Sequence, residues 1–139
     1  MLLLDKLIIT EDRNFDSESI LHLYRLNRWS SAEKPDQLLS ALRGSHSLVL
    51  AYYEQLLVGL GNAISDGYLV VYYPHLLVHP NYHGFGIGTK IIRRLQKKYA
   101  DYHQQVLVAD GKAIQFYEKC GFERAGLTQP MWIYQGKEH

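Results

Sequence analysis

The stretch "VHPNYHGFGIG" (78–88) places glycine at every second position near its end, at Gly84, Gly86 and Gly88. Glycine loses more conformational entropy on folding than any other residue, so this density needs positive φ angles or something packed against the bare backbone. The preceding residues 69–78, "LVVYYPHLLV", are rich in β-branched and aromatic side chains, which is the composition of a strand. The stretch therefore predicts a glycine-rich loop that leaves a strand.

A helix is predicted directly after the loop. Its apolar residues recur at helical spacing on one face and its basic residues occupy the other: Ile87, Ile91, Ile92, Leu95 and Tyr99 against Lys90, Arg93, Arg94, Lys97 and Lys98. The unpaired N–H groups of a helix's first turn and the helix dipole attract anions, most often phosphate. We expect the loop to bind phosphate. The alternative is a tight turn that binds nothing.

Two familiar phosphate loops do not fit this stretch. A Walker loop ends in Gly-Lys-Ser or Gly-Lys-Thr, whereas the order here is Gly88-Thr89-Lys90. A dinucleotide-binding fingerprint needs a glycine where Thr89 stands, and too little chain follows for the second half of a doubly wound fold. The predicted phosphate site therefore belongs to another class of fold.

Length and composition predict one soluble globular domain over 1–139, because the 139 residues are 47% hydrophobic and 21% charged with net charge +1. The basic residues between Lys90 and Lys98 are interpreted as the solvated face of a helix, so no nucleic-acid partner is expected. Residues 1–10 lack a basic leader and a cleavage site, and no apolar run approaches the roughly 20 residues that span a bilayer. No membrane partner is expected, and the expected location is cytoplasmic. The single Cys120 excludes an internal disulfide, and the seven histidines show no metal-ligand spacing, so no metal is expected.

The remaining segments alternate between strand and helix patterns. Strands are predicted at 1–10, 46–54, 56–65, 69–79, 105–109, 122–127 and 130–135, and helices at 18–27, 36–44, 87–99 and 113–120. Asp16 or Ser17 is the expected N-cap of the first helix, and Gly44 and Gly121 are expected to end the second and fourth. The order β-α-α-β-β-β-α-β-α-β-β indicates an α/β fold, a mixed β-sheet flanked by helices.

Two motifs within this order resemble the GNAT superfamily of N-acetyltransferases, and the resemblance covers essentially the whole chain. The family's acyl-CoA loop, Gln/Arg-x-x-Gly-x-Gly/Ala, is similar to "HGFGIG" (83–88). Its later motif, Asn-x-x-Ala-x-x-Phe-Tyr-x-Lys-x-Gly-Phe, is similar to "DGKAIQFYEKCGF" (110–122). This chain departs from the pattern at His83, in place of Gln or Arg, and at Asp110, in place of Asn. The resemblance implies a single-domain GNAT-like fold over 1–139 whose sheet splays between its fourth and fifth strands.

The resemblance also implies an acyl-CoA-dependent N-acetyltransferase. Such an enzyme moves an acetyl group from acetyl-CoA to a primary amine of a small-molecule or protein acceptor, by direct attack in a ternary complex. The CoA pyrophosphate would lie on the glycine loop and the pantetheine arm along the fourth strand. The implied cofactor contacts are Leu76, Leu77, Val78, His83, Gly84, Phe85, Gly86, Ile87, Gly88, Thr89, Asp110 and Phe116.

Two catalytic candidates follow from the resemblance and from the expected splay. Pro74 supports the splay, because proline cannot donate to a strand ladder and is expected at an edge or a bulge. A backbone N–H freed there, assigned to Leu77, would stabilise the oxyanion formed from the thioester. Tyr117 would act on the departing CoA thiolate; without the motif it would be interpreted as a core tyrosine. With ordinary pKa values near 10 for tyrosine and 8.5 for a thiol, full proton transfer runs uphill by about 2 kcal/mol, which favours hydrogen bonding over transfer.

The sequence leaves three roles open. The group that takes the proton from the amine is not identified, and His75, His79, Asp66 and a water chain all remain candidates. His83 either contributes a cationic ring that attracts the CoA phosphates or contributes only its backbone, with the ring in solvent. Cys120 as a nucleophile would require an acyl-enzyme, whereas a lone cysteine on the inner face of a helix is usually a small buried hydrophobe.

The acceptor cannot be identified from the sequence. In the family, the connection between the first two helices and the last pair of strands line the acceptor cleft, which implies Trp29, Glu33, Tyr72, Met131 and Trp132 as substrate contacts. These residues suit a primary amine with an apolar body, and Glu33 could pair with an ammonium group. The alternative function is a non-catalytic acyl-CoA-binding regulatory module, and a third hypothesis is a phosphate-binding domain without CoA. A homodimer is left open.

Overall fold

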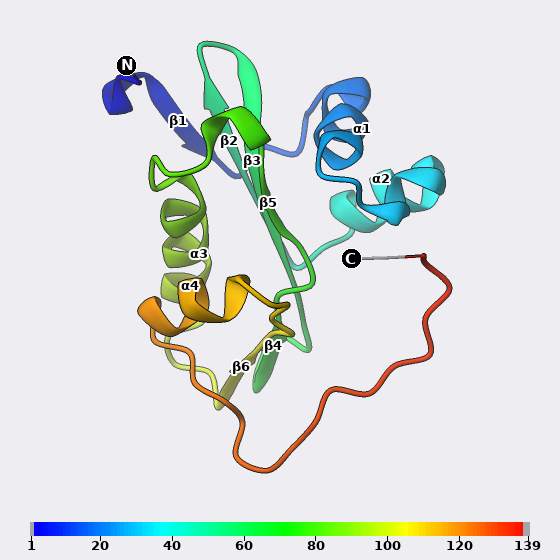
Figure 1. The fold of residues 1–139 in the computed structure, drawn as a ribbon, viewed down its shortest axis with the longest axis vertical. Coiled ribbons are helices and arrows are strands. Elements are labelled where there is room, and N and C mark those ends of the chain that lie inside the picture. The colour runs from blue at the N-terminus through cyan, green and yellow to red at the C-terminus, as the bar shows by residue number, and fades with distance from the viewer. Residues whose placement is uncertain (1, 138–139) are drawn as a thin grey trace.

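A computed structural model describes residues 2–137 and shows one open mixed sheet with helices on both faces (Figure 1). The strands are β1 (Leu7–Thr10), β2 (Ser47–Tyr53), β3 (Leu56–Ser65), β4 (Val70–Tyr72), β5 (Leu76–Val78) and β6 (Gln104–Val106). The order across the sheet is β1-β2-β3-β4-β6, and β5 also pairs with β3. All pairs are antiparallel except β4 with β6. The α/β fold class predicted from the sequence is confirmed.

The four predicted helices are present, and they divide the core into two layers. They are α1 (Ser17–Leu26), α2 (Pro35–Arg43), α3 (Ile87–Lys98) and α4 (Ala113–Lys119), and 3-10 turns span Leu4–Lys6, Ser30–Glu33 and Pro80–Tyr82. Helices α1 and α2 bury Leu23 and Leu42 on one face of the sheet, while α3 buries Ile91 and Leu95 on the other (Figure 1). Asp16 caps α1 as predicted, because its carboxylate accepts the N–H of Ser19 at 3.0 Å. The two layers leave both faces of the central strands buried.

The predicted final pair of strands, 122–127 and 130–135, is wrong. No residue of either range is in a strand, and after α4 the chain runs as an irregular segment across the molecule toward the start of α2 (Figure 1). Leu127, Met131 and Ile133 are 97%, 92% and 96% exposed, so the alternating apolar pattern of this segment does not mark a buried face. A strand requires a neighbouring edge to pair with, and sequence alternation alone does not supply one. The predicted strand 105–109 is also shorter, since β6 ends at Val106.

The predicted strand 69–79 is divided by a β-bulge into β4 and β5. Ile64 of β3 pairs with Tyr72, and Gly61 pairs with Leu76, so three steps along β3 correspond to four steps along the other strand. The extra residue lies at Tyr73–Pro74, which together face one residue of β3. Proline has no N–H to donate, so it is tolerated where the ladder is already interrupted. Pro74 therefore lies where the sequence predicted an edge or bulge.

Asn62 of β3 compensates for the interrupted ladder. Its backbone N–H donates to the carbonyl of His75 at 3.1 Å, and its side-chain Oδ1 accepts the His75 N–H, also at 3.1 Å. Its Nδ2 donates to Ser45 Oγ at 3.0 Å, so both polar atoms of this buried side-chain amide have a partner. An unpaired backbone N–H in this interior would be costly, so Asn62 makes the bulge compatible with a buried sheet.

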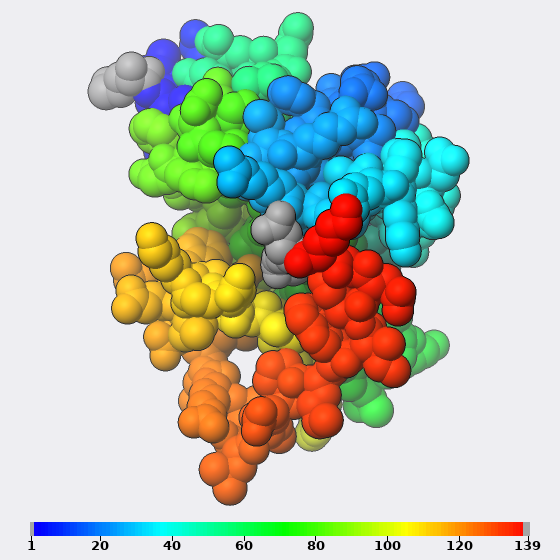
Figure 2. All heavy atoms as spheres, turned by 45° about the vertical axis from the view of Figure 1, so that its right-hand side comes forward, coloured from blue at the N-terminus to red at the C-terminus, as the bar shows by residue number. Residues whose placement is uncertain are grey.

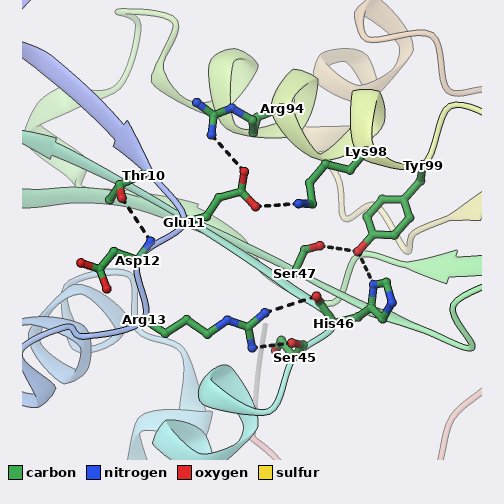
Figure 3. A network of polar contacts seen from close by, with 10 residues as sticks. All are labelled: Thr10, Glu11, Asp12, Arg13, Ser45, His46, Ser47, Arg94, Lys98 and Tyr99. Atoms are coloured by element: carbon green, nitrogen blue, oxygen red, sulfur yellow. Dashed lines mark hydrogen bonds and ion pairs between the residues drawn. The ribbon is translucent and has the colours of Figure 1, made fainter.

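Polar contacts join the first strand to α3 and to the start of β2 (Figure 3). The Glu11 carboxylate accepts from Lys98 at 2.7 Å and from Arg94 at 3.1 Å, and the Lys98 hydrogen bond is the main cause that lowers the pKa of Glu11. The guanidinium of Arg13 donates to the carbonyls of Arg43, Ser45 and His46. The Glu11 ion pairs are partly exposed, so each contributes at most about 1 kcal/mol. This network therefore fixes the end of β1 against α3 and the start of β2, and it contributes little to the free energy of unfolding.

Helix α3 lies directly on two glycines of β3. A Cβ at Gly61 would lie 2.6 Å from Cγ2 of Ile91, and a Cβ at Gly59 would lie 2.8 Å from Cδ1 of the same residue. Real Cβ atoms do not approach side chains this closely, so the two glycines set the height of α3 above the sheet. The N-terminus of α3 follows the glycine loop, and its position therefore depends on this packing.

We predict that Gly61→Ala lowers the free energy of unfolding by about 1–3 kcal/mol, because overpacking a close-packed layer costs this much. Gly59→Ala is expected to cost less, because its shortest contact is with Cδ1 of Ile91, which can turn away, and Cγ2 of Ile87 is farther off at 3.0 Å. At Gly61 the shortest contact, at 2.6 Å, is with Cγ2 of Ile91, which cannot move without a change of χ1. Urea denaturation followed by circular dichroism measures both values. The double variant Gly59→Ala/Ile91→Val lacks the Cδ1 atom and serves as the control. Equal losses for both glycines, with no recovery in the double variant, would contradict this packing.

Candidate active site

The glycine loop has the backbone conformation that an anion site requires. Gly84 and Gly86 have φ angles of 85° and 82°, in the left-handed region, and a Cβ at either residue would meet no atom within 4 Å. The first helical hydrogen bond runs from the Lys90 N–H to the carbonyl of Gly86 at 3.0 Å. The N–H groups of the first turn of α3 consequently have no acceptor within the helix, and this turn contains no acidic residue. The open space beside the loop and its N–H groups fit a pyrophosphate.

The other residues predicted to contact the cofactor lie around this loop. A Cβ at Gly88 would lie 3.4 Å from Phe116 of α4 and 3.6 Å from Val78 of β5, so α3, α4 and β5 meet at this glycine. Phe85 and Thr89 are exposed, whereas Ile87 is buried in the core. The structure therefore assigns Ile87 to packing, with only its backbone facing the loop. Asp110 lies exposed in the connection from β6 to α4.

His83 is exposed, and its ring makes a hydrogen bond to the protein. Its Nε2 lies 2.9 Å from the carbonyl oxygen of Val78, and because a carbonyl can only accept, Nε2 donates this hydrogen bond. The contact holds the loop against the outer edge of β5. His83 is nevertheless an exposed residue, so both alternatives for its ring, attraction to phosphate and a role of the backbone alone, stay predictions.

The bulge leaves an open backbone edge on β5. His75 and His79 both direct backbone groups toward β3, since the Asn62 N–H donates to the His75 carbonyl and the His79 N–H donates to the Val58 carbonyl at 2.8 Å. Residues alternate along an antiparallel ladder, so Leu77, which faces Leu60, also directs its N–H and C=O toward β3. The backbone groups of Leu76 and Val78 therefore point the other way.

This geometry corrects the assignment of the catalytic N–H to Leu77. Strand β6 does not cover the open edge, because its described pairing ends where Tyr73 donates to the Val106 carbonyl at 3.1 Å. The predicted splay between these strands is confirmed. The N–H groups that it exposes belong to Leu76 and Val78, and the one next to the bulge belongs to Leu76. The sequence identified Pro74 as the interruption, but a one-residue shift of the ladder exchanges which residues face outward.

Tyr117 of α4 lies on the α3 side of the sheet and packs edge-to-face against Phe116 and Phe122, with ring centroids 5.1 and 5.8 Å away. Burial, with a smaller contribution from Cys120, raises the pKa of Tyr117 to about 12. A tyrosine with this pKa stays protonated at neutral pH and can donate a hydrogen bond. Cys120 is 2% exposed, and burial raises the pKa of its thiol. A neutral buried thiol is a poor nucleophile, so the geometry disfavours an acyl-enzyme on Cys120.

A cavity of about 390 Å³ opens on the opposite, α1–α2 side of the bulge. Its lining residues are Trp29, Ser30, Ser31, Glu33, Lys34, Tyr72, Pro74, His75, Trp132, Tyr134, Gln135 and Gly136. Four of the five predicted acceptor contacts line it, and the exception is Met131, whose side chain is almost fully exposed. Tyr134 was not predicted, although its spacing of two from Trp132 could have indicated that the two rings share a side of the chain.

Two distant segments form the outer wall of this cavity. Figure 2 shows the C-terminal segment, in red, beside the connection from α1 to α2, in cyan. Tyr134 and Ser30 hydroxyl oxygens lie 3.1 Å apart, and Lys137 pairs with Glu33 at 3.4 Å. Trp132 stacks on Tyr134 with ring centroids 4.3 Å apart. The C-terminal segment therefore reaches the predicted cleft without forming a strand.

The three side chains proposed from the sequence as proton acceptors lie in different places. His75 lines the cavity, and its Nδ1 lies 2.7 Å from the Tyr24 hydroxyl. His79 is on a second open hollow with Tyr82, and burial is the main cause that lowers its pKa. Asp66 is in the β3–β4 turn, where it accepts the N–H groups of Tyr68, Leu69 and Val70. Of these three side chains, the cavity includes only His75.

Two further features, a cluster of metal ligands and a membrane-spanning helix, are absent from residues 2–137. No three His, Cys, Asp or Glu side chains in this part of the chain are arranged to hold a metal ion. None of the helices described there has the length and apolar character to cross a bilayer.

Comparison with known proteins places this site in a family. The profile of the family described as "Acetyltransferase (GNAT) domain" matches residues 44–124, more than half of the chain. A GNAT-family acetyltransferase, SP0256 from Streptococcus pneumoniae TIGR4, has a structure that superposes with a TM-score of 0.81 at 28% identity, over 93% of this chain and 98% of that one. A Deinococcus radiodurans R1 protein superposes with a TM-score of 0.82 at 24% identity, over 97% and 94% of the two chains, which shows the fold alone.

A curated relative extends beyond this chain. "Uncharacterized N-acetyltransferase ycf52" of Gracilaria tenuistipitata var. liui is 28% identical over 96 residues, which are 65% of this chain and 50% of that protein. The chain thus spans about half the length of this relative. The family match and the splayed sheet define a GNAT fold, and the chain belongs to the GNAT acetyltransferase family, whose acyl donor is acetyl-CoA.

We predict that Gly86→Val lowers the affinity for acetyl-CoA at least about tenfold, because a β-branched residue is strained at a φ of 82° and changes the direction of the loop N–H groups. Gly88→Ala is the matched control: its Cβ would make ordinary contact with Phe116, so fold and affinity should be largely retained. Isothermal titration with acetyl-CoA measures both, and thermal unfolding checks the folds. A folded Gly86→Val variant with unchanged affinity would show that the loop is not the anion site.

Proposed function

We propose that this protein transfers an acetyl group from acetyl-CoA to a primary amine by direct attack in a ternary complex. The observation that carries the proposal is the open edge of β5, which connects the glycine loop to the aromatic cavity through the bulge. The amine nitrogen forms a bond to the acetyl carbonyl carbon, and the carbon–sulfur bond breaks. The amine proton leaves and the thiolate gains one, so the products are an amide and free CoA thiol.

The backbone of the splay supplies the proposed binding groups. The N–H groups at the start of α3 would hold the pyrophosphate, and the outward N–H and C=O groups of Leu76 and the N–H of Val78 would pair with the pantetheine amides. The Leu76 N–H, next to the bulge, is the proposed donor to the thioester oxygen as negative charge develops on it. A donor that is fixed in a strand needs little reorganisation during the reaction, which is why such groups stabilise a transition state effectively.

Tyr117 is the proposed hydrogen-bond donor to the leaving sulfur. With a pKa of about 12 for Tyr117 and 8.5 for a thiol, full proton transfer would cost on the order of 5 kcal/mol, more than for an exposed tyrosine. Burial therefore supports donation of a hydrogen bond to the thiolate rather than loss of the phenolic proton. Water would then supply the proton that converts the thiolate into thiol.

The acceptor is proposed to enter from the side of α1 and α2. The cavity there is bounded by the rings of Trp29, Tyr72, Trp132 and Tyr134, which suits an apolar body on the amine. Glu33 and Lys34 both lie on its rim, so the charge there is mixed, and Glu33 is already paired with Lys137. This arrangement supports a largely apolar amine rather than a polycation.

Two measurements test the proposed function. In a thermal-shift titration, acetyl-CoA at 100 times its dissociation constant should add about 2.7 kcal/mol of stability. Release of free thiol from acetyl-CoA is then followed on addition of a panel of primary amines. Binding of acetyl-CoA without thiol release for any amine would favour the non-catalytic acyl-CoA-binding module. If acetyl-CoA caused no thermal shift, CoA would be excluded as the ligand.

We predict that Tyr117→Phe lowers kcat about tenfold or more and leaves the dissociation constant of acetyl-CoA within about twofold. The reason is that the hydroxyl contributes mainly when charge develops on sulfur, whereas the ring packing against Phe116 and Phe122 is kept. Steady-state kinetics with the best amine of the panel and titration with acetyl-CoA measure the two quantities. Normal turnover in the variant would show that the Tyr117 hydroxyl takes no part in the reaction and that the residue serves only in packing.

A further inference from the structure

Helix α4 carries Tyr117 and is attached to α3 at two points. Both helices lie on the same side of the sheet (Figure 1). In the middle of α4, the Phe116 ring packs on the first turn of α3, since a Cβ at Gly88 would lie 3.4 Å from that ring. At the end of α4, two side chains of α3, those of Arg93 and Gln96, reach its last carbonyls. Tyr117 lies in the chain between these two points.

Hydrogen bonds from α3 satisfy the carbonyls at the end of α4. The guanidinium of Arg93 donates from Nη2 to the Lys119 carbonyl at 3.3 Å and from Nη1 to the Cys120 carbonyl at 3.2 Å. Gln96 donates from Nε2 to the same Cys120 carbonyl at 2.7 Å, and its Oε1 accepts from Nη1 of Arg93 at 3.3 Å. The last carbonyls of a helix have no partner within the helix, and a cation there also interacts favourably with the helix dipole. Arg93 and Gln96 therefore cap the C-terminal end of α4.

Helix α4 depends on tertiary contacts for its position. It comprises seven residues, Ala113–Lys119, none of which is completely buried, and no side chain caps its start. A helix this short is marginal by itself, so its place is set by what it packs against. The connection before it, at Asp110, is exposed. The contacts with α3 are therefore a main determinant of where the ring of Tyr117 lies.

One helix, α3, thus positions both partners of the proposed hydrogen bond between Tyr117 and the leaving sulfur. Its first turn is the proposed site of the pyrophosphate, which sets where the sulfur of acetyl-CoA lies. Its middle holds the end of α4, which sets where the Tyr117 hydroxyl lies. A hydrogen bond weakens steeply as its length and angle depart from their preferred values, so a small shift of α4 would reduce what the hydroxyl contributes.

We propose that Arg93, together with Gln96, positions the Tyr117 hydroxyl at the leaving sulfur by fixing the end of α4 to α3. This inference rests on the proposed function and deepens it. Arg93 is a positioning residue, because it acts through α4 and its hydrogen bonds to that helix go to backbone carbonyls. Its planar guanidinium presents several N–H groups and reaches two carbonyls at once, which the single ammonium group of a lysine does less well.

The attachment of α4 is tested without any amine. Arg93→Met removes both guanidinium hydrogen bonds and keeps an unbranched side chain. The backbone amides of Cys120 and Gly121, which close the last turn of α4, should then exchange their hydrogens at least about tenfold faster. Lys97→Met is the matched control, since Lys97 is exposed on the same helix and makes no hydrogen bond or ion pair within residues 2–137. Unchanged amide exchange in Arg93→Met would overturn the inference.

The effect on the reaction is tested by kinetics with the best amine of the panel, at a temperature at which thermal unfolding shows every variant folded. Arg93→Met should lower kcat about fivefold or more and leave the dissociation constant of acetyl-CoA within about twofold, because the start of α3 is unchanged. Arg93→Lys should recover part of the loss, and Lys97→Met should leave kcat unchanged. Gln96→Met, which removes the shortest of these hydrogen bonds, takes the place of Arg93→Met if that variant does not fold.

A double-mutant cycle separates positioning of Tyr117 from a purely structural role. If Arg93 acts through the Tyr117 hydroxyl, adding Arg93→Met to Tyr117→Phe should lower kcat by less than about twofold more. An equal loss with and without the hydroxyl would overturn the inference and leave the proposed function standing. Failure of the wild type to acetylate any primary amine would remove the proposed function and the positioning role that rests on it, while amide exchange would still report whether Arg93 holds α4.

Discussion

The single extra residue at Tyr73–Pro74 is the constraint on which the site depends. A regular strand through 69–79 would keep both of its edges paired, with β3 on one side and β6 on the other. The bulge reverses which residues face outward, so that Leu76 and Val78 present backbone groups to a gap and His75 turns its backbone toward Asn62. It also separates β5 from β6, and the gap between them connects the two sides of the sheet.

Each side of that gap is built by a different part of the chain. On the α3 side, Gly59 and Gly61 let the helix approach the sheet closely, and Gly88 lets α4 approach the first turn of that helix. The helix begins without an acidic residue, so its dipole and N–H groups are not neutralised by the protein itself. Close packing and an uncompensated helix terminus thus produce the proposed anion site.

On the other side, the acceptor cavity combines a rigid inner wall with a weakly held outer wall. His75 belongs to the inner wall and is fixed by hydrogen bonds to Tyr24 and Asn62 and by its contact with the Tyr24 ring. The outer wall depends on exposed contacts such as Lys137 with Glu33, and surface pairs of this kind contribute about 0–1 kcal/mol each. The part of the cavity near the proposed reacting centre is therefore preorganised, while the outer wall is the part that can adjust to a proposed acceptor.

The sequence by itself determined the helices, most of the strands, the glycine loop and the interruption at Pro74, because these follow from periodicity, composition and the missing proline N–H. It also placed Trp29, Glu33, Tyr72 and Trp132 at one cleft through the family resemblance. Only the tertiary structure decided that the backbone N–H of Leu76 rather than that of Leu77 faces the gap. The side toward which a residue directs its backbone groups depends on the register of the strand pairing. Only the structure showed that 122–135 forms no strand and that the Tyr24 hydroxyl lies beside the ring of His75, because edges and contacts between residues 51 positions apart exist only once the chain is folded.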